Sequence, residues 1–415
     1  MPVRVLAWLI VALGAAPAIA GEAEWPQWRG PNRDGKSSET GLLRQWPQQG
    51  PRLLWQAPVG GGYSSVSIAG GVIYTTGDEA GTTMMLAFDL DGKLKWKKPV
   101  GPAWTGGYPG TRSTPTLSHG KAYLLTGRGL LACLDAATGN KVWEVDVVER
   151  LKGKPIADWY GYGESVLVEG KMVICTPGGP DACIAALDKT TGATIWASKG
   201  LSDQPGYSSP IAFGKGAARQ IATLTHKGLV GVSAANGRFL WRYDRPANSN
   251  ANITTPIFSG GCIFAATGYG HGGGMAKLAP AGGGMAAKEV WDTKDMQPLV
   301  GEAVLVNGCL YGGHESGGWN CIEFATGKVA YKKQGGGRGP VTFADGMLYL
   351  LDEASGRMML VPATPKEFKP VSTFNVPKSA DSLFWAMPVI CGGRLYVRHW
   401  TTLYAYDIKA DGASR

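Results

Sequence analysis

The sequence predicts an all-β protein: an eight-bladed β-propeller of four-stranded antiparallel blades, closed by an N-terminal strand that completes the last blade. Three observations support this. Tryptophan recurs at intervals of 41, 47, 53, 45 and 50 residues, at Trp55, Trp96, Trp143, Trp196, Trp241 and Trp291. The residues before these tryptophans repeat as strand, glycine turn and strand. A second strand pair precedes each repeat, and units of this length with four strands are typical of propeller blades.

The outer strand pair of each blade is the more regular half of the repeat. Each copy has an apolar strand, a glycine-bearing turn and an alternating run that ends on tryptophan, which is the pattern of a tight hairpin. The copies span residues 87–96, 133–143, 186–196 and 231–241, and a degenerate copy at 321–331 has Tyr331 in place of tryptophan. The turn glycines supply the positive φ that such a turn needs.

The inner strand pair recurs eight times. Each copy begins with small or polar residues and continues as an apolar run, a turn and a β-rich strand. The copies span residues 64–77, 113–127, 165–178, 208–226, 254–268, 302–313, 339–352 and 386–399. The repeats run from Leu53 to Asp407, which gives about 44 residues per blade and matches the length expected of a four-stranded blade.

The two ends of the repeat region complement each other. Residues 401–412 reach the end of the chain before any outer strand, whereas residues 52–59 form a strand with no inner strands before it. We therefore expect the segment at 52–59 to supply the outer strand of blade eight. This pairing closes the ring and removes an exposed sheet edge, so the propeller is expected to span residues 52–410.

Residues 1–20 have the pattern of a secretory signal peptide. A single charge, Arg4, precedes an apolar stretch that ends in Ala-Ile-Ala before Gly21. A membrane anchor is the alternative, but Pro17 and the short apolar core disfavour it. No cysteine lies at the cleavage point to carry a lipid. We expect a periplasmic or secreted protein with no membrane span in the mature chain.

Residues 21–51 contain no repeat but three tryptophans: Trp25, Trp28 and Trp46. This segment is too aromatic for a disordered linker. We expect a strap that packs over the ring and is anchored by its indoles. The alternative is that Trp25 and Trp28 cover the opening of the ring or present a binding surface.

Charge and cysteine content exclude several classes of function. The 41 Lys and Arg and 32 Asp and Glu give a net charge of +9 without any basic run, so a nucleic-acid partner is not expected. None of the seven cysteines has the spacing of a haem or zinc motif. Two cysteine pairs flank predicted hairpins, Cys175 with Cys183 and Cys309 with Cys321. Each pair is interpreted either as a disulfide or as two buried thiols.

Candidate binding residues gather on one face of the predicted ring. In a propeller, the blade-to-blade connections and the loops between second and third strands share a face, and such loop-built faces commonly bind ligands. Four of the five histidines fall in second-to-third-strand loops: His226, His271, His314 and His399. The blade connections add nine residues: Tyr63, Arg112, Tyr162, Glu164, Tyr207, Asn252, Glu302, Arg338 and Trp385.

The chemistry of these side chains suggests possible ligands. Oxygens of Glu164, Asn252 and Glu302 are the kind that calcium prefers. Arg112 and Arg338 could bind carboxylates of an acidic ligand or a quinone, and an aromatic ring of this face could stack on a planar group. The alternative is that these charges pair with one another around the channel and the histidines are solvated. No hydrolase or metalloprotease motif is present, and the catalytic and metal-binding residues stay unassigned.

The turn-and-tryptophan repeat resembles that of the pyrroloquinoline-quinone (PQQ) enzyme family, whose propellers lock neighbouring blades with this tryptophan. The opening WPQWRGPNRDG resembles exported quinoprotein-like propellers without an assigned activity. The chain is also similar to the propeller scaffold lipoprotein of the outer-membrane β-barrel assembly machine. The resemblance implies an eight-bladed propeller. The adjacent-cysteine disulfide of many quinoprotein dehydrogenases and the lipidated cysteine of the scaffold are both missing here.

From these observations we expect an exported, monomeric, non-catalytic propeller that acts as a binding or assembly scaffold. Its partner would be a protein, a small ligand or a glycan on the loop face. One alternative is a PQQ- and calcium-dependent alcohol or sugar dehydrogenase, in which PQQ and Ca²⁺ would be the cofactors. A second alternative is a carbohydrate-binding propeller that uses the tryptophan and tyrosine rim.

Overall fold

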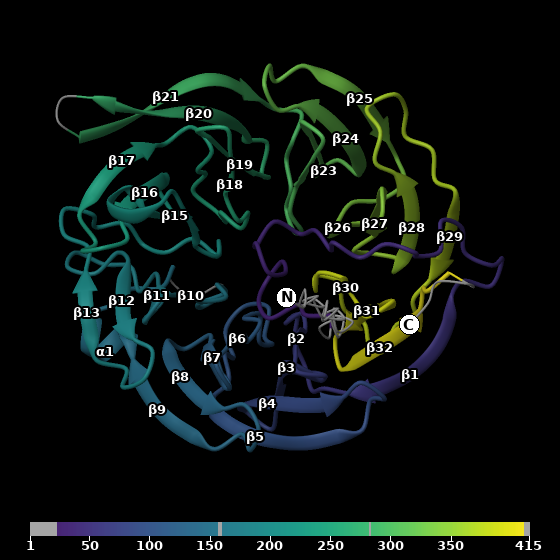
Figure 1. Ribbon diagram of the computed structural model, residues 1–415, viewed down its shortest axis with the longest axis horizontal. Coiled ribbons are helices and arrows are strands. Elements are labelled where there is room, and N and C mark those ends of the chain that lie inside the picture. The colour runs from purple at the N-terminus through teal and green to yellow at the C-terminus, as the bar shows by residue number, and fades with distance from the viewer. Residues whose placement is uncertain (1–22, 157–159, 282–283, 411–415) are drawn as a thin grey trace, which may run out of the picture.

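The computed structural model describes residues 23–156, 160–281 and 284–410. Its strands form eight separate four-stranded antiparallel sheets arranged around one central axis (Figure 1). The predicted fold class is therefore confirmed. The predicted signal peptide at 1–20 lies outside the described residues. In the described part of the chain, no helix has the length and apolar character needed to cross a membrane.

Each blade runs from an inner strand near the axis to an outer strand at the rim. Blades one to four comprise β2 (Ser67–Ala69), β3 (Val72–Glu79), β4 (Thr82–Asp89), β5 (Leu94–Pro102); β6 (Thr116–Ser118), β7 (Lys121–Leu125), β8 (Leu130–Asp135), β9 (Lys141–Asp146); β10 (Leu167–Glu169), β11 (Met172–Cys175), β12 (Ala185–Asp188), β13 (Thr194–Ala197); β14 (Ile211–Phe213), β15 (Gln220–Leu224), β16 (Leu229–Ser233) and β17 (Phe239–Tyr243). Blades five to eight comprise β18 (Ile257–Ser259), β19 (Cys262–Thr267), β20 (Gly272–Ala281), β21 (Gly284–Thr293); β22 (Val304–Val306), β23 (Cys309–His314), β24 (Gly318–Glu323), β25 (Val329–Gln334); β26 (Val341–Ala344), β27 (Met347–Leu351), β28 (Arg357–Pro362), β29 (Ser372–Asn375); and β30 (Val389–Cys391), β31 (Arg394–His399), β32 (Thr402–Asp407) with β1 (Arg52–Pro58). A short helix, α1 (Val147–Leu151), follows β9.

The ring is closed by the N-terminal strand. Strand β1 pairs antiparallel with β32, from Arg52 opposite Asp407 to Pro58 opposite Thr402. An ion pair of 2.7 Å between Arg52 and Asp407 lies at one end of this seam. The closure expected from the sequence is confirmed, and it places the two ends of the propeller in one blade.

The recurring tryptophans dock each blade on the next. The indole of Trp143 in blade two lies against Gly192 in the outer turn of blade three, where an added Cβ would come within 2.8 Å of the ring. Its Nε1–H donates to the carbonyl of Lys189 at 3.0 Å. The same arrangement joins four further pairs: Trp55 with Gly92, Trp96 with Gly139, Trp196 with Gly237, and Trp291 with Gly327. Glycine is required at these turns both for its positive φ and for its missing side chain.

Trp241 departs from this pattern. Its indole N–H donates within its own blade, to the side chain of Gln220 at 2.6 Å. The outer hairpin of blade five, β20 and β21, has ten residues in each strand, so its turn is carried outward beyond the position of the usual tight turn. The hairpin itself packs against β17 of blade four instead (Figure 1).

Hydroxyl groups link the inner ends of successive blades. At the start of the first three inner segments, a backbone N–H donates to the side chain at the equivalent position in the next blade. These bonds run from Ser65 to Thr114 at 3.0 Å, from Thr114 to Ser165 at 2.9 Å, and from Ser165 to Ser209 at 2.9 Å. The recurring small polar residues of the sequence therefore form a belt around the channel.

The N-terminal strap covers one end of the channel. Trp25 exchanges backbone hydrogen bonds with Ile68 of the inner strand of blade one, at 2.9 and 2.8 Å. Further along, the carboxylates of Asp345 and Glu39 join the strap to turns between first and second strands in blades seven and eight. Trp46 is buried against Tyr349 and Phe374. The strap thus lies on the face opposite the blade connections and crosses the centre of the ring (Figure 1).

The cysteines form no disulfide. All seven lie in the described residues and all are free. Strand register explains this, because Cys175 lies opposite Ala185 rather than Cys183. Likewise, Cys321 lies opposite Tyr311 rather than Cys309. The buried-thiol interpretation therefore describes both pairs.

Candidate functional site

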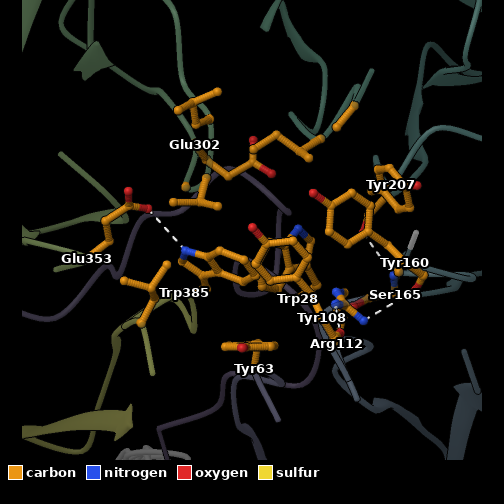
Figure 2. A pocket seen from close by; sticks show the side chains of 18 of the residues that line it. Trp28, Tyr63, Tyr108, Arg112, Tyr160, Ser165, Tyr207, Glu302, Glu353 and Trp385 are labelled. Carbon is orange, nitrogen blue, oxygen red and sulfur yellow. Dashed lines mark hydrogen bonds between the residues drawn. The ribbon is translucent and has the colours of Figure 1, made fainter. Parts of the chain in front are cut away.

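The face of the blade connections holds a pocket of about 290 Å³ at the mouth of the central channel (Figure 2). Seven aromatic side chains among the described residues line it: Trp28, Tyr63, Tyr108, Tyr160, Tyr207, Tyr269 and Trp385. Most of them belong to the loops that enter successive inner strands. We call this pocket, with these seven side chains, the aromatic cup.

Trp28 comes from the strap and distinguishes the cup from an open channel. Its indole N–H donates to the hydroxyl of Thr255 in the inner belt, at 3.0 Å. Because the strap approaches from the opposite face, Trp28 closes the inner end of the cup. The side chains of Arg29 and Arg33, both buried, fill the channel beside it.

The aromatic rings of the wall contact one another in series. The centroid of Tyr63 lies 4.6 Å from that of Trp385, with 39° between the ring planes. Tyr108 lies 5.5 Å from Trp385 and 5.3 Å from Tyr160, at 38° and 34°. Tyr160 meets Tyr207 edge-on, at 5.2 Å and 88°. These contacts hold the rings in a continuous tilted wall.

Arg112, which also lines the cup, holds this wall together. Its guanidinium lies 5.6 Å from the ring of Tyr63 and 5.3 Å from that of Tyr160, within the range of cation–π attraction. It also donates to the carbonyl oxygens of Gly110 at 3.0 Å and of Tyr108 and Tyr160. Burial lowers the pKa of Arg112 below its usual value. The arginine therefore serves the loops that carry the rings.

The second arginine of the cup, Arg338, is paired with a carboxylate. Its Nε lies 2.7 Å from Glu353, and the other oxygen of Glu353 accepts the indole N–H of Trp385 at 3.1 Å (Figure 2). This ion pair fixes the orientation of Trp385. Arg338 is thus compensated by Glu353, whereas Arg112 has no carboxylate within ion-pair distance among the described residues.

Glu302 takes part in the inner belt instead of binding a cation. Its carboxylate accepts the backbone N–H of Thr255 at 2.7 Å and the hydroxyl of the same residue at 3.0 Å. Arg29 lies 3.6 Å away. Burial outweighs this attraction and raises the pKa of Glu302 to about 7. Glu302 in blade six therefore accepts a backbone N–H of the preceding blade, as the hydroxyls of Thr114, Ser165 and Ser209 do in blades two to four.

The other predicted cation ligands are likewise engaged elsewhere. Glu164 accepts the backbone N–H of Thr176 at 2.6 Å, and burial raises its pKa to about 7 despite the nearby charge of Arg33. The amide of Asn252 donates to carbonyl oxygens of Thr225 and its neighbours. In the described ranges, no three His, Cys, Asp or Glu side chains come together as a metal site. These residues do not fit a calcium-bound quinone.

His226 and His271 lie in the expected loops, whereas His314 and His399 are the last residues of β23 and β31; none of the four lines the cup. His399 is buried, accepts the N–H of Ser379 at 2.7 Å, and has its pKa lowered by burial. His271 bonds to the carbonyl of Arg245 at 2.7 Å, and His314 bonds to Ser316 at 2.8 Å. His226 lies in the loop between β15 and β16.

Of the predicted residues, the structure brings six together in the cup: Tyr63, Arg112, Tyr207, Glu302, Arg338 and Trp385. Tyr162 lies outside it and donates its hydroxyl to the carbonyl of Pro177 at 2.7 Å. Sequence reasoning missed Tyr108, Tyr160, Tyr269 and Glu353. The aromatic runs WTGGY and WYGYG in the second and third blade connections were the available signal.

Comparisons with known proteins agree with this fold. The PQQ_2 family model, described as "Outer membrane protein assembly factor BamB", matches residues 82–362. Outer membrane protein assembly factor BamB of Shewanella oneidensis is 22% identical over 279 residues, which are 63% of this chain and 66% of that protein. Quinoprotein alcohol dehydrogenase PedH of Pseudomonas putida is 29% identical over 120 residues, 28% of this chain and 20% of the dehydrogenase. The chain thus spans less than two thirds of either relative.

Solved structures show the same architecture. BamB from Moraxella catarrhalis superposes with a TM-score of 0.63 at 15% identity, over 87% of this chain and 99% of that one. Quinohemoprotein alcohol dehydrogenase from Comamonas testosteroni gives 0.65 at 13% identity, over 94% and 81%. At this identity the structures support the fold alone. Because the family model covers more than half of the sequence, the chain belongs to the PQQ-repeat β-propeller family described by the outer membrane protein assembly factor BamB.

Proposed function

We propose that this protein is an exported, non-catalytic β-propeller that acts as a binding scaffold, with the aromatic cup as its ligand site. One observation carries the proposal: the strap closes the channel through Trp28, so the aromatic wall encloses a dead-end pocket. Pockets with mostly aromatic walls and few polar groups are the usual form of small-ligand sites.

The state of the charged residues supports binding over catalysis. A general acid or base must reach the reacting group of the substrate. The carboxylates of Glu164 and Glu302 accept backbone N–H groups instead, and Glu353 is held by Arg338 and Trp385. These side chains hold the cup in shape, which is the role expected of supporting groups in a rigid binding site.

The relatives support export and a scaffold role. The family description and the Shewanella protein both bear the name of an outer membrane assembly factor. The predicted signal peptide at 1–20 fits an exported protein as well. We therefore propose that the protein acts outside the cytoplasm, where its cup would bind a soluble molecule or part of a larger partner.

A fluorescence screen tests this proposal. Neutral and charged sugars, capped peptides and planar heterocycles are titrated into the purified protein, and binding is read from the change in total tryptophan emission, to which Trp28 and Trp385 contribute. Trp385→Ala removes one ring of the wall, whereas Phe239→Ala removes an exposed aromatic ring from β17, outside the cup. We expect a ligand that binds the parent and Phe239→Ala and is lost in Trp385→Ala. No binding in the whole screen, or equal binding in Trp385→Ala, would overturn the proposal.

A further inference from the structure

We propose that the aromatic cup binds a neutral, hydroxylated ring, the chemistry of one pyranose unit of a saccharide. This inference rests on the proposed function, since it names the ligand of the same site. It follows from the charge of the cup, the tilt of its rings, its free hydroxyl donors and its size.

The charges of the cup disfavour a charged ligand. A cation would meet Arg112, whose guanidinium already lies over the faces of Tyr63 and Tyr160. An anion would be attracted by Arg112 but would also face the carboxylates of Glu302 and Glu353, and Arg338 is already paired with Glu353. Because moving a charge out of water is costly unless it is paired there, the cup is suited to a neutral molecule.

The ring geometry leaves no slot for a flat aromatic ligand between neighbouring wall rings. A planar ring held between two others needs about 7 Å between their faces, twice the usual carbon–carbon contact distance. The neighbouring wall rings of Tyr63, Trp385 and Tyr108 instead lie 4.6 to 5.5 Å apart and are tilted by 38° to 39°. A puckered ring that places its C–H face on one aromatic side chain at a time matches such a wall better than a flat slab.

Two serine hydroxyls supply neutral hydrogen-bond donors at the base of the wall. Ser165 and Ser209 line the cup and are buried. Each oxygen accepts a backbone N–H of the preceding blade, from Thr114 and from Ser165 respectively, both at 2.9 Å. Within the described part of the chain, neither hydroxyl donates a hydrogen bond of its own. Their protons are free to meet the oxygen atoms of a sugar.

The size of the cup sets the length of the ligand. A volume of about 290 Å³ is at the lower end of small-molecule sites, which span roughly 300–1,000 Å³. The cup therefore holds one sugar ring, with room for part of a second. A longer glycan would place only its terminal unit inside.

Isothermal titration calorimetry on the full mature chain tests the inference. The probes are maltose, cellobiose and N,N′-diacetylchitobiose as neutral sugars, with glucosamine, digalacturonic acid and quinoline as the cationic, anionic and planar counterparts. We expect at least one neutral sugar to bind, and at least tenfold more tightly than any charged or planar probe. Trp385→Ala should weaken this binding at least tenfold. Trp385→Phe should restore part of it, and Phe239→Ala should leave it unchanged.

A conservative variant separates binding from folding. Ser209→Ala removes one free donor and also the acceptor of the Ser165 N–H, so its thermal unfolding midpoint is measured beside its affinity; weaker sugar binding by a variant that stays folded is the expected result. Binding of quinoline, a charged sugar or a peptide, but of no neutral sugar, would overturn the inference and leave the proposed function standing. Neutral-sugar binding that survives Trp385→Ala would also overturn it. If no probe binds in the calorimeter and no compound binds in the fluorescence screen, the proposed function itself is wrong.

Discussion

The contact between Trp143 and Gly192 makes a quantitative test of how the blades are joined. Gly192 has a φ of +72°, and a Cβ at this position would lie 2.8 Å from the indole of Trp143. Gly170, in the turn between the inner strands of the same blade, has a φ of +57° and nothing within 4 Å of an added Cβ. Gly192→Ala and Gly170→Ala therefore share the backbone strain but differ in the contact with tryptophan.

The expected loss of stability has two contributions, the backbone strain of alanine and the steric contact with the indole. Placing alanine in a left-handed conformation costs about 1 kcal/mol, which both variants should lose. Overpacking against the indole adds about 1–3 kcal/mol for Gly192→Ala alone. With an unfolding entropy of roughly 2 cal/mol/K per residue, a domain of this size shifts by about 1 °C for each kcal/mol. We expect the unfolding midpoint to fall by about 1 °C for Gly170→Ala and about 2–4 °C for Gly192→Ala.

Differential scanning calorimetry of both variants at one scan rate measures these shifts. A double-mutant cycle with Trp143→Leu isolates the contact, because the leucine variant should remove most of the extra loss at Gly192. Equal shifts for the two glycine variants would refute the reasoning, as would an extra loss at Gly192 that persists without the indole.

Three further outcomes are expected. Burial raises the pKa of Glu302 from 4.5 to about 7, so the stability that comes from this protonated carboxyl is fully present below about pH 4.5 and is lost as the pH rises through about 7. In the parent protein, the unfolding free energy should therefore fall by up to about 3 kcal/mol more over this pH range than in Glu302→Gln. Urea unfolding at several pH values measures both proteins, and the same pH dependence in the two would contradict this. Arg29→Met leaves the Glu302 carboxylate unpaired and should cost roughly 3 kcal/mol at pH 8 but less at pH 5, where the carboxyl is protonated; the same urea series measures it, and equal losses at both pH values would count against the pairing. Ellman's reagent should find seven thiols in protein unfolded without reductant, with only the half-buried Cys262 reacting quickly in the folded protein, and a count below seven would reveal a disulfide.

The fold was predictable because its determinants are local. Within each outer hairpin, the turn glycine and the tryptophan of the following strand are only a few residues apart in sequence, and this short motif recurs with nearly constant spacing. The closure by β1 also followed from an outer strand without inner strands. The ten-residue strands of the β20–β21 hairpin were not predicted, since a long hairpin differs from a short one only by the distance to its turn.

The cup was only partly predictable because its charged groups find partners far away in the chain. The blade connections correctly brought Tyr63 and Trp385 to one face. The role of Glu302, however, depends on Arg29 in the strap, and nothing near Glu302 in the sequence signals that contact. The predicted histidines do not meet because they bond to nearby loops instead, as His271 does with the carbonyl of Arg245 and His399 with the N–H of Ser379.

Retention of quinone tests the central claim most directly, since it separates a binding scaffold from a quinone-dependent enzyme on the same fold. The purified protein is incubated with excess PQQ and Ca²⁺ and then passed through a gel-filtration column. We predict that the quinone absorbance elutes apart from the protein. Quinone that co-elutes in stoichiometric amount, together with dye reduction when an alcohol or aldose is added, would contradict the account.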